Sequence, residues 1–325
     1  MRKMMHNLRK TFISTAAILF AIAIGTAAYA PSGHAAPTET AKTDTRKNED
    51  ARDHFEVRSS DGTTLAVTAQ GAVDAPEILL IHGLRQSHLS WAKQLSDPTL
   101  KGFRIVTFDL RGHGDSDKPA ALAAYSDADK WADDVNAVIR SAKLRRPVLV
   151  GWSLGGYVAG AYLRKYGGTH IAGINLVDAV TNMSPDLFTS EALGFAKSTT
   201  SHNLATRAAA TADFLFTCFY QAPTPSALQQ MMVINGMTSR AVYEGFLQTK
   251  TTNLEPFFAA YNGPVLLSHG IHDRLVKVAM SERIKSIHAN SRLSVFDNSG
   301  HSPFYEEPAR FNEELADFVK EATAK

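Results

Sequence analysis

Short apolar runs alternate with stretches of helical periodicity along most of this 325-residue chain. A run such as 77–81 (EILLI) has the length of a strand and is apolar on both faces, as a strand buried in a parallel sheet is. Strands are expected at 77–81, 103–110, 147–150, 171–177, 265–268 and 292–296. Helices are expected at 128–142, 154–166, 276–289 and 308–322. This alternation predicts an α/β fold, in which helices cover both faces of a mostly parallel sheet.

Two segments depart from the alternation. Residues 54–58 and 64–69 predict a hairpin around Asp61 and Gly62, a dipeptide typical of turns. Residues 181–258 contain helical stretches but no strand, and they are rich in large apolar side chains. Because this segment lies between two expected strands, we interpret it as a helical cap inserted before the penultimate strand. The alternative is that it simply adds to the core.

The amino terminus has the pattern of a secretory signal peptide. Residues 1–10 carry four cations and no acid, an apolar run follows, and small residues come next. We expect cleavage after Ala35, which leaves Ala36 first, a flexible polar leader at 36–54 and a folded domain at 55–325. A membrane anchor at 12–30 is the alternative, although polar residues interrupt that stretch. The chain is therefore expected to be exported, to the periplasm or the medium.

Composition excludes several classes of protein. The chain is 44% hydrophobic and 20% charged, an ordinary globular balance. Its 34 Lys and Arg against 32 Asp and Glu leave a net charge of +2, so no basic excess points to nucleic acid. A single cysteine, Cys218, cannot form an internal disulfide or a cysteine-based metal site alone. His269 and His272 lie near Asp273 without a carboxylate cluster at metal spacing, so we predict no metal site.

The segment 149–156 reads LVGWSLGG and contains G-x-S-x-G between an expected strand and an expected helix. In that context the turn is so sharp that Ser153 is held in a strained backbone conformation, and Gly151 and Gly155 avoid clashes. The serine hydroxyl is then expected to project from the sheet edge. The helix N-terminus beneath it favours developing negative charge.

A nucleophilic serine needs a base, and the base needs a residue that orients it. His301 follows the last expected strand, and Asp273 follows the strand before it. The carboxyl ends of parallel strands share one edge of a sheet, so both residues are expected to lie near Ser153. Asp178, after the strand at 171–177, is the alternative acid.

The turn after the strand at 77–81 is a candidate oxyanion hole. His82 and Gly83 follow that strand, and the backbone there can direct the Leu84 amide at the serine. With the Leu154 amide it would provide two donors to an oxyanion. His82 itself is expected to have a structural role.

The loop at 109–116 reads DLRGHGDS and follows another expected strand. Its glycines indicate a tight loop near the same edge, which Arg111, His113 and Asp115 are expected to order. A phosphate-binding loop would need G-x-x-x-x-G-K, and the chain has no such motif.

Together these motifs resemble those of the α/β-hydrolase fold superfamily. The resemblance covers the chain from about Phe55 to Lys325. Within the superfamily, the chain is most similar to the small esterases and to the cofactor-free haloperoxidase and perhydrolase-like members. It rests on five motifs in the expected order: His82-Gly83, 109–114 (DLRGHG), 151–155 (GWSLG), His269-Gly270 with Asp273, and Gly300-His301 with Pro303, Glu306 and Pro308.

The resemblance implies that Ser153 is the nucleophile, His301 the base and Asp273 the orienting acid, with Leu84 and Leu154 as oxyanion donors and no cofactor. We therefore predict an exported serine hydrolase that cleaves a small carboxylic ester by two-step acyl transfer. Its binding partner would be a small ester-like substrate, and we expect no partner nucleic acid. We also expect no stable association with a membrane if the signal peptide is cleaved. Alternatives are C–C bond, lactone or thioester hydrolysis, or perhydrolysis, at the same triad. A ligand-binding sensor built on the same fold is the non-enzyme alternative.

Overall fold

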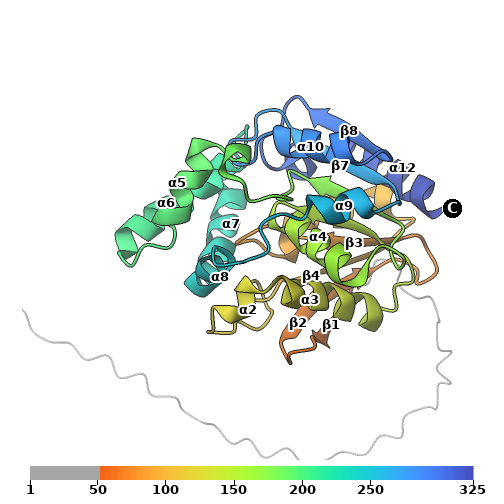
Figure 1. Ribbon diagram of the computed structural model, residues 1–325, viewed down its shortest axis with the longest axis horizontal. Coiled ribbons are helices and arrows are strands. Elements are labelled where there is room, and N and C mark those ends of the chain that lie inside the picture. Colours follow the sequence, from red (N-terminus) through yellow and green to blue (C-terminus); the bar gives the residue numbers. More distant parts are fainter. Residues whose placement is uncertain (1–51, 325) are drawn as a thin grey trace, which may run out of the picture. The chain divides into compact units, whose positions relative to one another are not determined.

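Eight strands form one sheet in the order β1-β2-β4-β3-β5-β6-β7-β8. The computed structural model describes residues 52–324 (Figure 1). β2 is antiparallel to β1 and β4, and the other neighbouring strands are parallel. The strands are β1 Asp53–Arg58, β2 Thr64–Gln70, β3 Glu77–Ile81, β4 Arg104–Phe108, β5 Val148–Trp152, β6 Gly173–Val177, β7 Val265–Gly270 and β8 Ser291–Phe296. The mostly parallel sheet predicted from the sequence is confirmed.

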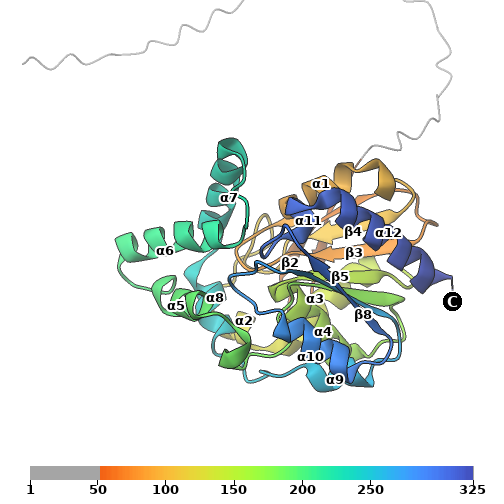
Figure 2. The ribbon, with the colours of Figure 1, turned by 90° about the horizontal axis from the view of Figure 1, so that it is seen from above.

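Helices cover both faces of the sheet (Figure 2). α3 (Ala128–Ser141), α4 (Leu154–Tyr166), α9 (Glu255–Ala260) and α10 (Ala279–Ile287) pack on one face. On the other face lie η1 (His88–Trp91), α1 (Ala92–Ser96), η2 (Pro98–Leu100), α11 (Pro303–Glu306) and α12 (Pro308–Thr323).

β3 shows why the central strands are apolar throughout. Leu79 and Ile81 belong to the core beneath α3 and α4, whereas Ile78 and Leu80 belong to the core beneath α1 and α12. Successive side chains of a strand point to opposite faces, so a strand covered on both sides needs apolar residues at every position.

Some boundaries differ from the expected ones. β1 begins at Asp53, one residue before the strand expected at 54–58, and β5 continues to Trp152, directly before Ser153. α10 begins at Ala279 instead of 276, because Val276 forms an isolated β-bridge with Phe188 and its amide donates to Asp273. The short helix α2 (Ala123–Ser126) was not predicted, since four residues are too few for a periodic signal.

Between β6 and β7 the chain is helical. η3 (Pro185–Leu187), α5 (Ser190–Ser198), α6 (Leu204–Thr217), α7 (Pro225–Met237) and α8 (Arg240–Phe246) precede α9. We call α5–α8 the cap; it projects from one end of the sheet in both ribbon views (Figures 1 and 2). α9 packs on α4 instead, so the end of the segment 181–258 belongs to the layer that covers the sheet. The large apolar residues divide accordingly: Phe258 is buried, whereas Phe216 on the cap is half exposed.

The expected signal peptide (1–35) and all but the last residues of the expected leader (36–54) lie outside the described residues. Within residues 52–324, no helix is long and apolar enough to cross a membrane.

Candidate active site

Ser153 stands at a sharp turn between β5 and α4. Its φ of 54° and ψ of −115° are unusual for a residue with a side chain, and such strain costs about 1–3 kcal/mol. Three backbone hydrogen bonds hold the turn. The Ser153 amide donates to the Val177 carbonyl, and the Ser153 carbonyl accepts from Gly156 and Val180. The backbone conformation therefore depends on β6 and on the residues that follow it.

The two glycines of the motif permit close contacts. A Cβ on Gly151 would lie 2.5 Å from the Gly155 carbonyl oxygen. A Cβ on Gly155 would lie 2.3 Å from the carbonyl oxygen of Ile81. Both distances are far below van der Waals contact, so only glycine lets α4 begin directly against β3 and β5. This is the steric requirement that the motif implied.

His301 and Asp273 are joined by a hydrogen bond. The His301 Nδ1 atom lies 2.7 Å from Asp273 Oδ2, and both side chains are almost completely buried. Asp273 Oδ1 accepts from the amides of Leu275 and Val276, which fixes the carboxylate. Burial opposes ionisation of Asp273, but the charge and hydrogen bond of His301 outweigh it and lower the pKa of this carboxyl. Asp273 is therefore anionic and orients the imidazole.

The His301 loop also contacts the turn at Ser153. The Trp152 indole donates to the His301 carbonyl oxygen at 2.6 Å, and the two rings lie 5.9 Å apart. His301 uses Nδ1 for Asp273, which leaves Nε2 to exchange a proton with a reacting group. The structure thus brings Asp273 and His301 into contact and places His301 against the residue that precedes Ser153.

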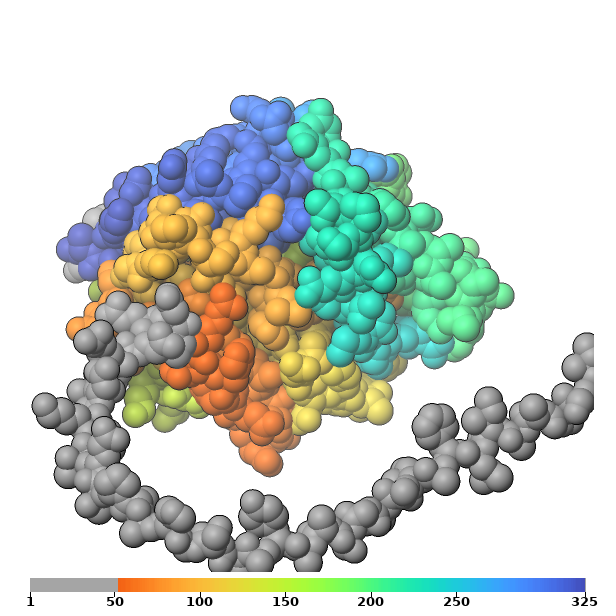
Figure 3. All heavy atoms as spheres, turned by 180° about the vertical axis from the view of Figure 1, so that it is seen from behind, coloured from red at the N-terminus to blue at the C-terminus, as the bar shows by residue number. Residues whose placement is uncertain are grey.

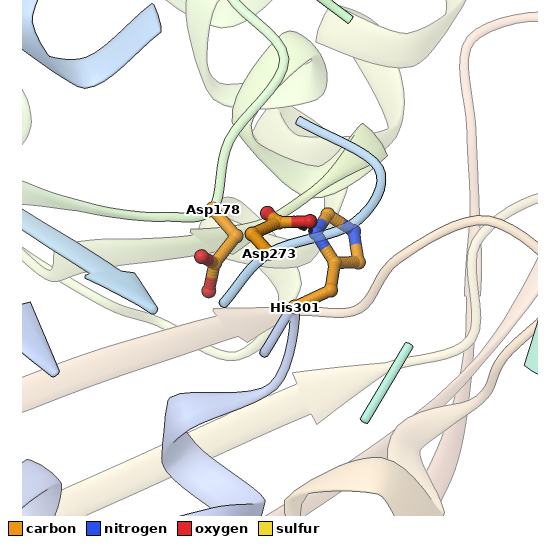
Figure 4. Close-up of side chains that lie close together, drawn as sticks. All are labelled: Asp178, Asp273 and His301. Atoms are coloured by element: carbon orange, nitrogen blue, oxygen red, sulfur yellow. Dashed lines mark hydrogen bonds and ion pairs between the residues drawn. The ribbon is translucent and has the colours of Figure 1, made fainter. Parts of the chain in front are cut away.

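Asp178, the alternative acid, lies beside Asp273 instead of on His301 (Figure 4). Asp178 is buried with φ 41°, and its Oδ1 accepts from the Gly270 amide at 2.9 Å. Burial and the neighbouring negative charge of Asp273 raise the pKa of Asp178 well above its usual value. Asp178 is therefore the protonated member of a carboxyl pair, and Asp273 is the charged member.

Asp178, Asp273 and His301 also have the residue types of a cation site. One ligand atom from each lies within 4.8 Å of the others. The contact between His301 and Asp273 already uses the atoms that would bind a cation, and a protonated Asp178 is a poor ligand. The arrangement fits proton sharing better than metal binding.

The loop after β3 passes directly against Ser153. A Cβ on Gly83 would lie 3.2 Å from the Ser153 Cβ. Within residues 52–324, neither the Leu84 amide nor the Leu154 amide donates to a protein group. Two free amides flanking one serine fit the donors of an oxyanion hole.

His82 and the loop at 109–116 support this edge of the sheet. His82 Nδ1 contacts the Gly83 carbonyl and Nε2 accepts from the Leu110 amide, while burial lowers the pKa of His82 to about 4. Arg111 is completely buried and forms ion pairs with Asp61 and Asp134. These contacts are structural, as expected for both residues.

Comparison with known proteins agrees with this geometry. The sequence model of the α/β-hydrolase fold family matches residues 76–308. The chain belongs to the α/β-hydrolase fold family.

Several proteins resemble this hydrolase over most of its length. A Burkholderia cenocepacia protein assigned as an aryl esterase is 38% identical, with a TM-score of 0.80 over 84% of this chain and 100% of the other. The esterase RhEst1 from Rhodococcus sp. ECU1013 is 27% identical, with a TM-score of 0.75 over 82% and 98%. The bifunctional esterase/perhydrolase DCH of Acinetobacter calcoaceticus is 28% identical over 81% and 99%. The predicted fold and the predicted hydrolase class are confirmed.

The cap of this α/β-hydrolase is tied to the His301 loop through Glu306. Glu306 Oε1 accepts from the amides of Tyr220 and Gln221, between α6 and α7, and Oε2 accepts from the Gly300 amide. Tyr220 also stacks on His272 with ring centroids 3.7 Å apart. The position of the cap and that of the proposed base are therefore linked.

A cavity of about 100 Å³ lies between the cap and the body of this hydrolase. Its walls are mostly apolar and come from α7, from α1 and η1, and from α11; in Figure 3 the teal cap atoms lie beside orange and blue atoms of the body. Trp152 and Ser302, the neighbours of Ser153 and His301, line it. It provides apolar space close to the proposed nucleophile and base.

Sequence reasoning missed two further features of this edge. The bridging role of Glu306 could not be inferred, because its partners in the cap, Tyr220 and Gln221, are about 85 residues away along the chain. Arg85, a buried cation beside Leu84, showed no distinguishing pattern. Cys218 is buried, and burial raises the pKa of its thiol well above the usual value, so it is not a reactive thiolate.

Proposed function

We propose that this chain is an exported serine hydrolase that cleaves a small carboxylic ester. The observation that carries the proposal is the 2.7 Å contact between His301 and Asp273 beside a strained Ser153 in a hydrolase fold. Relatives named as esterases support the ester substrate. Export rests on the amino-terminal sequence pattern alone.

The proposed reaction has two steps. Ser153 attacks the ester carbonyl while His301 accepts its proton through Nε2, and Asp273 stabilises the imidazolium. The Leu84 and Leu154 amides hold the oxyanion of the tetrahedral intermediate. His301 then protonates the departing alcohol, which leaves an acyl group on Ser153. Water, activated by His301, hydrolyses that acyl group and restores the serine.

A chain-length series of p-nitrophenyl esters tests this function. We expect hydrolysis with a preferred acyl length, because the cavity near Trp152 is small and apolar. Ser153→Ala and His301→Ala should each lower kcat by at least about 10⁴-fold, as loss of triad members does in other serine hydrolases. Asn290→Ala is the matched control, because Asn290 is exposed and lies at the end of β8 opposite to the His301 loop. Equal rates for the wild type and Ser153→Ala would refute the proposal.

A fluorophosphonate probe gives a readout that needs no suitable ester. It should modify Ser153 covalently in the wild type and leave Ser153→Ala unmodified by intact-mass measurement. If the probe labels Ser153 but no ester is hydrolysed, Ser153 is a reactive nucleophile and simple esters are not its substrates.

Perhydrolysis is a second candidate activity of the same site. The relative DCH is named a bifunctional esterase/perhydrolase. In that reaction hydrogen peroxide replaces water in the attack on the acyl-enzyme and yields a peracid. Peracid formation from acetate and hydrogen peroxide, absent in Ser153→Ala, would establish it.

A further inference from the structure

Arg85 is a buried cation directly beside the proposed oxyanion hole. It follows Leu84 in the loop after β3, has φ 61° and is only 4% exposed. A non-glycine residue with positive φ is strained, and such strain gathers near functional sites. The inference below rests on the proposed ester hydrolysis and concerns the class of ester.

The guanidinium of Arg85 has few acceptors. Nη1 donates to Thr211 Oγ1 on α6 at 2.8 Å, and Nη2 donates to the Thr199 carbonyl at the end of α5 at 3.2 Å. Nε is buried and has no acceptor among residues 52–324. A guanidinium has five N–H donors in one plane, so two neutral acceptors leave a fork of donors unfilled.

The charge of Arg85 is also uncompensated. No carboxylate in the described part of the chain forms an ion pair with it. The ionisable groups that interact with it are the Tyr243 hydroxyl, the cation Arg207 and the imidazole of His113. Burial lowers the pKa of Arg85, although an arginine remains charged. Arg111 is equally buried and has two carboxylate partners. A buried charge without a counter-ion destabilises a protein. An anion bound to the Arg85 guanidinium would remove this cost.

The residues around Arg85 come from two parts of the fold. Thr199, Thr211 and Tyr243 belong to the cap, whereas Arg85 belongs to the loop that contacts Ser153. The side chain therefore lies at the boundary between the cap and the oxyanion loop, two residues after Gly83, whose backbone lies against Ser153.

We propose that Arg85 binds a carboxylate carried by the ester substrate, so that this hydrolase prefers anionic esters to neutral ones. A carboxylate fits the guanidinium fork with two parallel hydrogen bonds. It also supplies the missing negative charge. The carboxylate belongs to the acyl part or to the alcohol part of the ester, and the experiment separates these sources.

Two pairs of isosteric esters test the preference. On the acyl side, p-nitrophenyl hemisuccinate is compared with neutral p-nitrophenyl isocaproate. On the alcohol side, m-carboxyphenyl acetate is compared with neutral m-acetylphenyl acetate. We expect kcat/KM for the anionic ester to exceed that of its isostere by about tenfold or more in one pair, chiefly through a lower KM.

Four variants assign the preference to Arg85. Arg85→Met should lower the anionic-to-neutral ratio of kcat/KM by about tenfold or more, and Arg85→Lys should keep part of it. Thr211→Val removes a cap contact but keeps the charge, so it should keep the ratio. Arg207→Met removes a nearby cation and should change the ratio by less than about threefold. Thermal melting checks that each variant is folded.

Several results would overturn the inference. The first is an anionic-to-neutral ratio of kcat/KM near one in both pairs of esters, and the second is a ratio that Arg85→Met does not lower. The third is that Arg207→Met lowers the ratio as much as Arg85→Met does, which would indicate that nearby positive charge in general causes the preference. An equal loss in Thr211→Val would mean that Arg85 only anchors the cap. Ser153-dependent hydrolysis of the neutral esters would leave the proposed function standing in each case. If no ester is cleaved, both proposals fall.

Discussion

Asp178 and Asp273 place two carboxyl groups in one buried space beside His301 (Figure 4). Two carboxylates so close in an apolar interior cannot both ionise, so one of them keeps a proton. Asp273 has the imidazole and two amides as partners, whereas Asp178 has the Gly270 amide. The hydrogen-bond donors decide which carboxyl is charged. Two aspartates that follow the neighbouring strands β6 and β7 therefore differ in charge: Asp178 is protonated and Asp273 is ionised.

Substitution by asparagine distinguishes these roles. Asp273→Asn should lower kcat about 10⁴-fold, because an amide donor opposite Nδ1 holds the imidazole in the wrong tautomer. Asp178→Asn should lower kcat less than about tenfold, because an amide resembles a protonated carboxyl. The check is kcat/KM on one p-nitrophenyl ester for both variants. The reverse order of effects would make Asp178 the acid of the triad.

The pH dependence of stability tests the protonated state of Asp178. A buried acid with a raised pKa keeps its proton in the folded state while the unfolded chain releases it above about pH 4. Its stabilising contribution is therefore present at low pH and is lost as pH rises. The Asp178→Asn variant has no such proton to lose. The free energy of unfolding of this variant, minus that of the wild type, should therefore increase between about pH 4 and pH 7, by at most about 1.4 kcal/mol per pH unit. Asp317→Asn, exposed on α12, is the control. A constant difference would contradict the assignment.

The links between elements centre on Glu306 of α11. Its carboxylate accepts amides from the α6–α7 connection and from the loop that carries His301. Burial raises the pKa of Glu306, so this side chain lies in a partly dehydrated place where its hydrogen bonds are strong. The cap is joined to the sheet edge here by a polar contact, in addition to apolar packing.

Removal of the Glu306 carboxylate should loosen the cap. In Glu306→Ala, backbone amide hydrogen exchange at Tyr220 and Gln221 should accelerate about tenfold or more, since hydrogen bonds to charged groups contribute about 1.5–3 kcal/mol. We expect kcat/KM to fall about tenfold because the His301 loop loses the same support. Glu314→Ala, which breaks an ion pair with Arg310 on the surface of α12, is the control. Unchanged exchange at 220–221 would show that apolar packing alone holds the cap.

For the whole molecule, export would change the charge as well as the location. Removing residues 1–35 takes away four cations and no Asp or Glu, so 34 cations become 30 against 32 anions and the net charge changes from +2 to −2. The amino-terminal cations lie in the expected targeting segment, so the enzyme would carry a net charge of −2 after cleavage.

Expression of the full chain in a Gram-negative host tests this expectation. We expect the protein in the periplasmic or extracellular fraction, with Ala36 as its first residue by intact-mass measurement, because small residues precede that bond. Ala35→Arg should block processing at this site. Full-length protein in the membrane fraction would support the anchor instead, and full-length protein in the cytoplasm would refute both.

The sequence by itself determined those features whose causes are local. Apolar runs marked the buried strands, and helical periodicity marked α3, α4 and α12, because burial of an element is reflected in its own residues. The strained turn at Ser153 was predictable because its two glycines meet neighbouring backbone. Asp273 and His301 could be named because both follow strands that end at the same edge.

Only the tertiary structure decided the features that depend on residues far apart in the chain. Arg85 and its partner Thr211 are 126 residues apart, and Glu306 and Tyr220 are 86 residues apart. No periodicity or spacing records such contacts, because they form only when the cap folds back on the sheet edge. The protonation of Asp178 has the same origin: its charge depends on which donors the packed strands bring to it and which they bring to Asp273.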